Sequence, residues 1–583
     1  MTSWVGRKKS PKIVFILTDD QDLHMDSLSY MPYLRKHIAD KGTTFTRHYC
    51  TVALCCPSRV SLWTGKAAHN TNVTDVNPPY GGYPKFISQG FNDDYFPIWM
   101  QSLGYATYYV GKLFNAQTID NYASPPAAGW TGSEFLLDPY TYRYLNATLT
   151  RNGGPPVSYE GQYSTDLIAY KSFGFLEDAL KQSQPFFLTI APTAPHSNVQ
   201  IGGNIDGNFT EHTNVQTPPI SAKRHEHLFR DITVPRTPSF NPDTPHGVSW
   251  ISRLPKQNGT NIASNDHFYR QRLRSLQAVD EMIDELVQRL EKAGILEETY
   301  IFFSTDNGYH IGQHRLQPGK QCAFEEDINI PFMVRGPGIA KNRTTDVVTS
   351  HIDLVPTFLS LAGGSSDTSP EIWRGFDGAV IPLHHLTEEQ KAMKPEHVNV
   401  EMWGVIQSEG KYGATLYPNH TYKALRIVGE SYNLLYTVWC SGEHELYDLV
   451  RDPYETTNIY VRNHSLAAVE VGGRRSEGYH ISDQQPLDAR IRPEQIVSLD
   501  RLIPRLDALI QVLRTCKGKQ CTHPWTSLHP NEKISILLEA LDSRFDRFYQ
   551  DQQRVEYDKC EKGYILASEG SIGVRPYLEG IGG

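Results

Sequence analysis

Short apolar runs recur along the first part of the chain, each bounded by turn-forming residues and separated from the next by segments with helical periodicity. These runs are Ile13–Leu17, Thr107–Val110, Phe186–Ile190, Tyr300–Ser304 and Phe332–Val334. Strands that are apolar at consecutive positions are typically buried on both faces, as in a parallel sheet covered by helices. The pattern therefore predicts an α/β fold with a mostly parallel central sheet.

Two of the intervening helices are predicted from their periodicity and their ends. Apolar residues recur every three or four positions from Leu273 to Leu290, and Gly294 stands where a glycine commonly ends a helix. A second helix is predicted over Ile352–Ala362, with Pro356 in its first turn.

The pattern changes near residue 396 to shorter, strand-like segments. Tyr422–Val428 and Tyr432–Val438 are separated by the turn-like sequence GES, which favours an antiparallel hairpin. We therefore expect an α/β domain over residues 1–395 and a smaller α+β subdomain, with an antiparallel sheet and terminal helices, over residues 396–583. Within the latter, Val471–Pro486 is predicted to be a loop.

The amino-acid composition and charge exclude several classes of protein. The 583 residues are 39% hydrophobic and 21% charged, which is typical of a soluble globular protein. A formal charge of −9 with scattered lysines and arginines argues against a nucleic-acid partner. No run of 18 apolar residues is present, so we expect no membrane span.

The compartment is less clearly indicated. The first ten residues lack the apolar stretch of a signal peptide, which fits either a cytosolic protein or a mature chain with a start Met added. Seven N-x-S/T sequons favour a secreted or lysosome- or vacuole-like glycoprotein. They lie at Asn72, Asn146, Asn208, Asn258, Asn342, Asn419 and Asn463. Among the eight cysteines, Cys516 and Cys521 are the expected disulfide, contributing about 2 kcal/mol.

Polar residues follow two of the predicted strands at the point where each strand ends. Asp19 and Asp20 follow the first strand, and Asp306 and Asn307 follow the fourth. Ligands of open parallel sheets collect at these ends, and carboxylate and amide oxygens are the ligands that Ca²⁺ prefers. Taken singly, however, each motif is equally consistent with a helix cap or a turn.

The segment ALCCPSRVSLWTGK, residues 53–66, contains the strongest candidate nucleophile. Pro57 suits the first turn of a helix that ends at Gly65, so Cys55 is expected at the positive N-terminal end. Backbone N–H groups would hold an anion there, and Arg59 would add further donors. A buried thiol or a structural disulfide is the alternative, although a bridge between Cys55 and Cys56 would close a strained ring.

These motifs resemble those of type I sulfatases, the formylglycine-dependent family. C-x-P-S-R followed by T-G is the family signature, and further matching segments occur in the family's order from residue 11 to about residue 460. They are VFILTDDQD, GYATYYVGK, PFFLTIAPTAPHS, STDNGYHIGQHRLQPGKQC and HELYDLVRDPYETTNI. The resemblance is closest to N-acetylglucosamine-6-sulfatases and fungal arylsulfatases, and it implies an alkaline-phosphatase-like fold.

The resemblance also implies the chemistry. A formylglycine-generating enzyme would convert Cys55 to formylglycine, whose hydrated form carries two hydroxyls. One would attack sulfur and displace the alcohol or phenol, and the other would then release sulfate. Arg59 would orient the hydrated aldehyde, while Cys56 would remain a thiol.

Further roles transfer from the family by position. The metal set for one Ca²⁺ per chain would be Asp19, Asp20, Cys55, Asp306 and Asn307. Lys112 and Lys320 would contact the sulfate, and His196 would protonate the leaving group. Many sulfatases carry a second histidine after Lys112, but Leu113 and Phe114 stand there in this chain. His310 is therefore expected to supply a polar contact to the sulfate or the leaving group.

The predicted function is hydrolysis of sulfate monoesters, either aryl sulfates or a sulfated sugar such as N-acetylglucosamine 6-sulfate. Substrate selection is expected in the loops of Gly202–Pro255. The alternatives are a phosphate or phosphonate ester hydrolase of the same superfamily, or a non-catalytic sulfated-glycan binder with Cys55 unmodified. The oxygen-only metal set argues against a two-zinc phosphatase, which would need histidine ligands.

Overall fold

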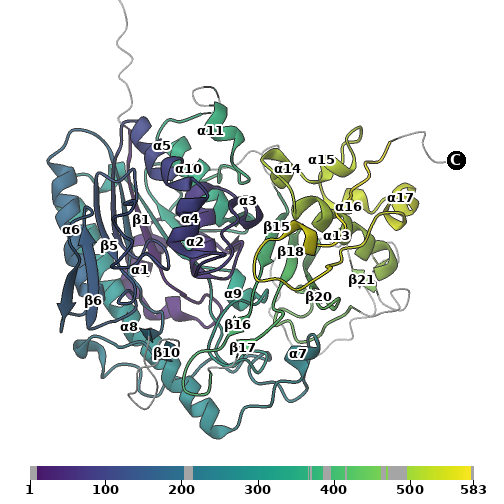
Figure 1. Ribbon diagram of the computed structural model, residues 1–583, viewed down its shortest axis with the longest axis horizontal. Coiled ribbons are helices and arrows are strands. Elements are labelled where there is room, and N and C mark those ends of the chain that lie inside the picture. Colours follow the sequence, from purple (N-terminus) through teal and green to yellow (C-terminus); the bar gives the residue numbers. More distant parts are fainter. Residues whose placement is uncertain are drawn as a thin grey trace, which may run out of the picture.

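The computed structural model has two parts, which Figure 1 shows side by side: a larger α/β part from the N-terminal two thirds and a smaller C-terminal part. The structure describes residues 10–201, 214–365, 367, 370–384, 395–413, 416–460, 468–470 and 496–578. The predicted loop Val471–Pro486 and the sequons at Asn208 and Asn463 lie outside these ranges.

The larger part is built on a ten-stranded sheet in the order β13-β2-β12-β11-β1-β8-β4-β5-β6-β7. Its centre is parallel: β11 (Thr299–Thr305), β1 (Lys12–Thr18), β8 (Phe186–Ala191), β4 (Ala106–Gly111) and β5 (Gly132–Leu136). The flanking strands are β2 (Thr43–Phe45), β6 (Asn146–Arg151), β7 (Val157–Glu160), β12 (Phe332–Arg335) and β13 (Arg343–Thr345). The predicted mostly parallel α/β sheet is confirmed.

One predicted strand pairs differently from the central strands. The run Phe332–Val334 lies in β12, which is antiparallel to both β11 and β2. The chain leaves β11 at its carboxyl end and re-enters the sheet from that same edge, so the next strand must run in the opposite direction.

Helices cover both faces of the large sheet. Successive side chains of β1 point to opposite faces and therefore pack in two different cores. Phe15 packs in the core that contains α2 (Cys55–Thr64), α5 (Phe96–Ser102) and α10 (Leu354–Leu361). Val14 and Ile16 pack on the opposite face, against α6 (Ser164–Leu180) and α8 (Gly259–Lys292). The two predicted helices correspond to α8 and α10, and Gly294 has a positive φ of 71° just after α8 ends.

The smaller part contains a four-stranded antiparallel sheet in the order β15-β18-β19-β20. These strands are β15 (His397–Met402), β18 (Tyr422–Val428), β19 (Asn433–Trp439) and β20 (His444–Asp448). Helix α13 (Leu499–Leu513) shares a core with this sheet. The predicted hairpin is thus confirmed, whereas the domain boundary at residue 395 stays a prediction.

Short elements complete the two parts. The short helices are α1 (Pro32–Leu34), α3 (Ala68–Thr71), α4 (Gly82–Ser88), α7 (Ser249–Ser252), α9 (Glu325–Ile328), α11 (Pro370–Arg374), α14 (Lys519–Thr522), α15 (Trp525–Leu528), α16 (Leu537–Ala540) and α17 (Asp546–Gln550). The short strands are β3 (His48–Tyr49), β9 (Asn198–Ile201), β10 (Asn214–Thr217), β14 (Thr349–Ser350), β16 (Ile406–Gln407), β17 (Leu416–Tyr417), β21 (Ala468–Glu470) and β22 (Ile496–Ser498).

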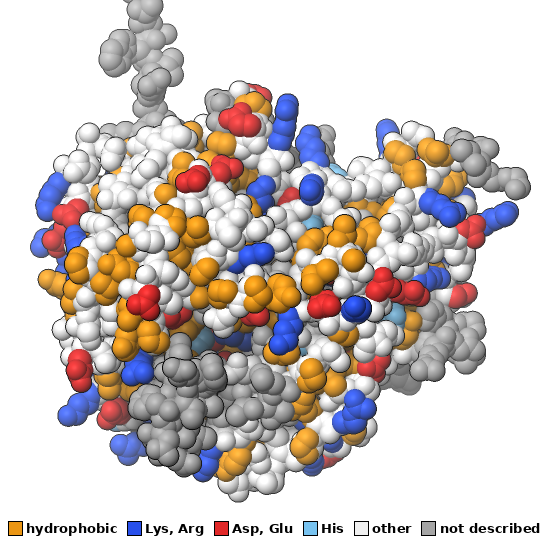
Figure 2. All heavy atoms as spheres, in the orientation of Figure 1, with side chains coloured by type: hydrophobic (Ala, Val, Ile, Leu, Met, Phe, Trp, Pro, Cys, Tyr) orange, Lys and Arg blue, Asp and Glu red, His pale blue; other side chains and the backbone are white. Residues whose placement is uncertain are grey.

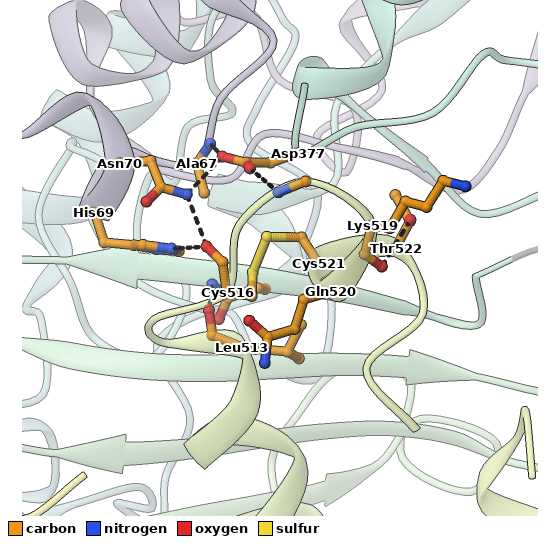
Figure 3. Close-up of a disulfide and its surroundings, with 12 residues drawn as sticks. Ala67, His69, Asn70, Asp377, Leu513, Cys516, Lys519, Gln520, Cys521 and Thr522 are labelled. Carbon is orange, nitrogen blue, oxygen red and sulfur yellow. Dashed lines mark hydrogen bonds between the residues drawn. A yellow bond between two sulfur atoms is a disulfide. The ribbon is translucent and has the colours of Figure 1, made fainter. Parts of the chain in front are cut away.

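Two disulfides lie in the smaller part. The predicted bridge Cys516–Cys521 is confirmed, and a second bridge joins Cys440 to Cys560. Figure 3 shows the Cys516–Cys521 loop against α3, where the carbonyl of Cys516 accepts hydrogen bonds from His69 and Asn70 at 2.9 and 2.8 Å. The loop thereby joins the smaller part to the chain that follows α2.

None of the helices that the structure describes is both long and apolar enough to cross a membrane. On the face shown in Figure 2, lysine and arginine side chains are interspersed with aspartate and glutamate. That face carries no extended patch of one charge sign.

Candidate active site

The parallel register of the sheet brings distant polar residues together at one edge. Thr18, the last residue of β1, pairs with Thr305, the last residue of β11, so Asp19 and Asp306 leave the sheet side by side. Gly111 at the end of β4 pairs in the same way with the end of β8, and Lys112 follows it. Side chains more than 280 residues apart in sequence are therefore neighbours.

Helix α2 places Cys55 and Arg59 at this edge of the sheet. Leu54 is the N-cap and Cys55 the first residue of the helix, while Gly65 ends it in the left-handed conformation with φ of 66°. The Ser58 hydroxyl donates a hydrogen bond to the carbonyl of Asp306 at 2.6 Å, which fixes the helix to the end of β11. The prediction that a helix begins at the cysteine pair and ends at Gly65 is confirmed.

Three cationic side chains form ion pairs with three carboxylates, and all six side chains are buried. Lys112 Nζ lies 2.6 Å from Asp19 Oδ2, and Arg59 Nε lies 2.8 Å from Asp306 Oδ2. Lys320 Nζ donates to Asp20 Oδ2 at 2.6 Å and lies 3.1 Å from Cys55 Sγ. The formal charges of the six side chains cancel, so a bound divalent cation would make the site net positive.

Burial and ion pairing shift the pKa values of these groups in different directions. Burial raises the pKa of Asp19, and repulsion from Asp306 adds to the effect. Burial is the largest single influence on Asp20 and acts to raise its pKa, but Lys320, His196 and Lys112 together outweigh it, so the pKa falls below its ordinary value. Burial strongly raises the pKa of the Cys55 thiol, so the unmodified cysteine is protonated at neutral pH.

The oxygens around Cys55 fit a hard cation. Cys55 Sγ lies 3.6 Å from Asp19 Oδ1 and 3.8 Å from Asp20 Oδ1. The Oδ1 of Asn307 is buried and has no hydrogen-bond partner among the described residues. A buried carbonyl oxygen without a partner costs free energy, and coordination to a metal would remove that cost. The donor set is therefore suited to calcium.

His196 lies beside this cluster in a fixed orientation. Its Nδ1 is 2.9 Å from the carbonyl of Ser197, which leaves Nε2 facing Asp20 Oδ2 at 3.5 Å. The imidazole stacks on the ring of Tyr142, with ring centroids 4.0 Å apart. Lys112 Nζ lies 4.9 Å from the centroid of the same ring. Tyr142 therefore contacts two of the predicted site residues.

A cavity of about 620 Å³ opens onto Cys55, His196 and Lys320. Its wall combines both parts of the molecule and contains many polar side chains. Besides those three, the polar lining residues are Asp75, Asn77, Asn115, Asp138, Tyr142, Gln216, Gln321, Gln407, Glu409 and Lys562. The cavity is large enough for a small ester bound with its anionic group at the charged cluster.

His310 lies away from the lining of this cavity. Its Nδ1 is 2.8 Å from a carboxylate oxygen of Asp327, and both residues are buried. The Asp327 carboxylate also accepts a hydrogen bond from the backbone N–H of Cys322. The geometry thus favours a role in holding the loop that carries Lys320, and a direct contact of His310 with substrate stays a prediction without support here.

The lining residues that were not singled out from sequence include Tyr142, Asp138 and Glu409. Tyr142 and Asp138 lie in the segment that follows β5, where no motif marks them. Glu409 lies in the smaller part, 354 positions after Cys55. Gln216, in contrast, lies within the loop region where substrate selection was expected.

Comparison with known proteins gives consistent matches. A family model described as Sulfatase matches residues 11–365. An arylsulfatase of Volvox carteri is 37% identical over 94% of this chain and 81% of its own length. An N-acetylglucosamine-6-sulfatase of Capra hircus is 32% identical over 77% of this chain and 80% of its own length.

A solved structure shares the fold at low sequence identity. It is that of BT4656 in complex with its substrate D-glucosamine-2-N, 6-O-disulfate, with a TM-score of 0.59, 22% identity, and coverage of 78% of this chain and 94% of that chain. At this level of identity the likeness concerns the fold alone.

Proposed function

The chain belongs to the sulfatase family and is a sulfuric ester hydrolase, and on this premise we propose that Cys55 is its nucleophile position and Ca²⁺ its metal. The observation that carries the proposal is the position of Cys55, at the first residue of α2 and 3.1 Å from Lys320. Converted to formylglycine and hydrated, this side chain supplies a hydroxyl nucleophile within the charged cluster.

The metal site rests on the oxygens of Asp19, Asp20, Asp306 and Asn307, with position 55 beside them. These oxygens would hold calcium, whose positive charge would polarise the sulfate oxygens. The buried, partnerless Oδ1 of Asn307 supports this assignment.

The remaining site residues bind the sulfate and donate a proton to the leaving group. Lys112, Lys320 and Arg59 present positive charge to the anion, and the buried setting strengthens that attraction. The carbonyl of Ser197 accepts a hydrogen bond from Nδ1–H of His196, so only the imidazolium form carries a second proton at Nε2, and that form passes the Nε2 proton to the oxygen of the leaving alcohol. A phenol, with a pKa of about 10, needs this proton less than a sugar alcohol does.

The substrate is proposed to be a small sulfate monoester, with aryl sulfates accepted and a 6-sulfated glucosamine as the natural type. The named relatives support both, since one is an arylsulfatase and another an N-acetylglucosamine-6-sulfatase. The cavity, lined by polar side chains from both parts, suits a compact ligand.

Maturation is proposed to take place in a secreted or lysosome-like route, where a formylglycine-generating enzyme would act on the C-x-P-S-R segment. Two disulfides support an oxidising compartment, because reducing cytosol rarely preserves such bridges. One sequon residue, Asn258, is exposed and caps α8 through Oδ1, so the cap does not use Nδ2, the atom to which an N-linked glycan is attached.

Replacement of the two neighbouring cysteines tests the proposal. Protein co-expressed with a formylglycine-generating enzyme should hydrolyse nitrophenyl sulfate faster than nitrophenyl phosphate. Cys55→Ala should lower turnover by at least about a thousandfold, because no other group can take the nucleophile's place. Cys56→Ala, buried next to it in the hydrophobic core, is the matched control and should retain most of the activity.

Two outcomes would count against the proposal. One is comparable turnover by Cys55→Ala. The other is faster hydrolysis of the phosphate, which would favour the phosphate ester hydrolase alternative.

A further inference from the structure

The wall of the cavity beyond the sulfate-binding cluster presents hydrogen-bond acceptors. We propose that Asp138 and Glu409 form a subsite that binds the hydroxyl or ammonium donors of a sugar and so selects sugar sulfates over aryl sulfates. This inference rests on the proposed function for the position of the sulfate. It concerns the sugar portion of the substrate, which this subsite would contact.

Asp138 is fixed in place but only half satisfied. Its Oδ2 accepts a hydrogen bond from the backbone N–H of Ala116 at 2.7 Å, and its own backbone N–H donates to the carbonyl of Gln117 at 2.8 Å. The Thr141 side chain acts on this carboxylate as a donor, but Oδ1 is shielded from solvent and has no hydrogen bond of regular geometry within the described ranges, although Asp138 lines the cavity. A buried carboxylate oxygen without a donor is unfavourable, and a ligand donor would satisfy it.

Two amide oxygens of other residues that line the cavity also lack a hydrogen-bond partner among the described residues. Asn115 donates through Nδ2 to the Tyr142 hydroxyl at 2.7 Å, while its Oδ1 has no partner among the described residues. Gln216 Oε1 is likewise buried without one. Asn115, Asp138 and Gln216 all line the cavity. The wall therefore offers several acceptors to one ligand.

Glu409 contributes a second carboxylate from the smaller part of the molecule. Its Oε2 accepts hydrogen bonds from the hydroxyls of Ser197 and Tyr309, the latter at 2.7 Å. Those two hydroxyls hold the carboxylate beside His196 and close to Lys320. Its Oε1 accepts no hydrogen bond from the residues that the structure describes, so it is available to a ligand.

Charge explains why this subsite is selective. A carboxylate beside an anion-binding site repels an anionic ligand unless that ligand also brings donors. The hydroxyl and amino groups of a glucosamine provide such donors, whereas the ring of an aryl sulfate provides none. A site built to accept hydrogen bonds discriminates against a ligand without donors, because the acceptors would remain unsatisfied.

Isosteric amides test the subsite, since each replaces an acceptor oxygen with a donor group at nearly constant volume. Asp138→Asn and Glu409→Gln are compared with the wild-type enzyme on glucosamine 6-sulfate and nitrophenyl sulfate. We expect the ratio of kcat/KM for the sugar sulfate to that for the aryl sulfate to fall about tenfold or more in each variant. Asp178→Asn, on the partly exposed surface of α6, is the matched control and should leave the ratio unchanged.

A binding measurement separates this inference from the catalytic one. In the Cys55→Ala background with calcium present, Asp138→Asn should weaken binding of glucosamine 6-sulfate about tenfold, while binding of inorganic sulfate should change far less. Equal losses for both ligands, or for both substrates, would overturn the subsite, as would unchanged sugar affinity and kinetics. Absence of turnover in formylglycine-bearing wild-type enzyme would instead contradict the proposed function, and the binding arm would still decide the subsite.

Discussion

Buried charge dominates the chemistry of this site at the scale of single residues. Asp19, Asp20 and Asp306 are each fully buried within reach of one another, and each has a cationic partner. Asn307 differs from them, because its Nδ2 donates to Asp20 at 2.8 Å while its Oδ1 has no partner among the described residues. That oxygen is the feature of the cluster that a metal ion explains best.

Calcium content and affinity test this assignment. Elemental analysis of the purified protein should find about one calcium per chain. Asn307→Ala should weaken calcium binding by at least about tenfold, since even the loss of an outer-shell partner has an effect of that size. Cys56→Ala, which removes no oxygen, should bind calcium like the wild type. Stoichiometric zinc, or calcium affinity that is unchanged in Asn307→Ala, would refute the assignment.

Sequence predicts residues of the site well where they lie in contiguous motifs and poorly elsewhere. Cys55, Arg59 and the four residues proposed as oxygen ligands follow strand ends or belong to the helix-starting segment, and the structure brings them together. Tyr142 and Glu409 carry no local signal, because the chain reaches the cavity there through irregular segments. Their positions depend on long-range packing, which a single sequence does not reveal.

At the scale of elements, Glu396 joins the start of β15 to the C-terminal helices. It is buried, and its Oε1 accepts hydrogen bonds from the backbone N–H of Leu537 at 2.7 Å and from Trp525 at 3.1 Å. The Tyr432 hydroxyl donates to its Oε2. Burial nevertheless raises the pKa of Glu396 to about 7.

This shift makes stability depend on pH. The carboxyl of Glu396 binds a proton more tightly in the folded chain than in the unfolded chain, so its contribution is complete below pH 4.5 and is lost as the pH rises to about 7. The loss amounts to about 3 kcal/mol. In thermal unfolding, the Tm of Glu396→Gln minus that of the wild type should therefore increase between pH 5 and pH 8. Glu177→Gln, on the surface of α6, should show no such change, and a flat difference for Glu396→Gln would contradict the prediction.

The elements that sequence predicts best are the buried ones. The cores of β1, β4, β8 and β11 are apolar at nearly every position, which marks them clearly. The edge strand β7 is mostly exposed and carries no such run, so it was not predicted. Helix α8 begins at Gly259, well before the predicted Leu273, because its first turns are polar and are started by the Asn258 cap rather than by apolar periodicity.

At the scale of the whole molecule, the smaller part is held against the larger one by buried polar contacts. His69, just after α2, lies 2.8 Å from Glu401 of β15, and Lys423 of β18 lies 3.0 Å from the same carboxylate. The Cys516–Cys521 loop adds the contacts of Figure 3. The docking places Glu409 and Gln407 on the wall of the cavity.

The disulfide between Cys440 and Cys560 closes a separation of 120 residues, against 5 for Cys516–Cys521. In the loop-closure view the longer bridge contributes about 5 kcal/mol and the shorter about 2. The shorter was predictable because its cysteines are near each other in sequence. The longer depends on how the C-terminal segment folds back onto β19, which no sequence pattern indicates.

We propose that Cys55, placed at the start of α2 inside the charged cluster, is the residue converted to the catalytic aldehyde. The mass of the peptide that contains Cys55 and Cys56, measured on catalytically active protein, tests this most directly. We predict the mass loss that accompanies replacement of one CH₂SH group by CHO, assigned by fragmentation to position 55, with Cys56 unchanged. A fully active protein in which position 55 is an intact cysteine, or in which the modification lies at position 56, would contradict the account.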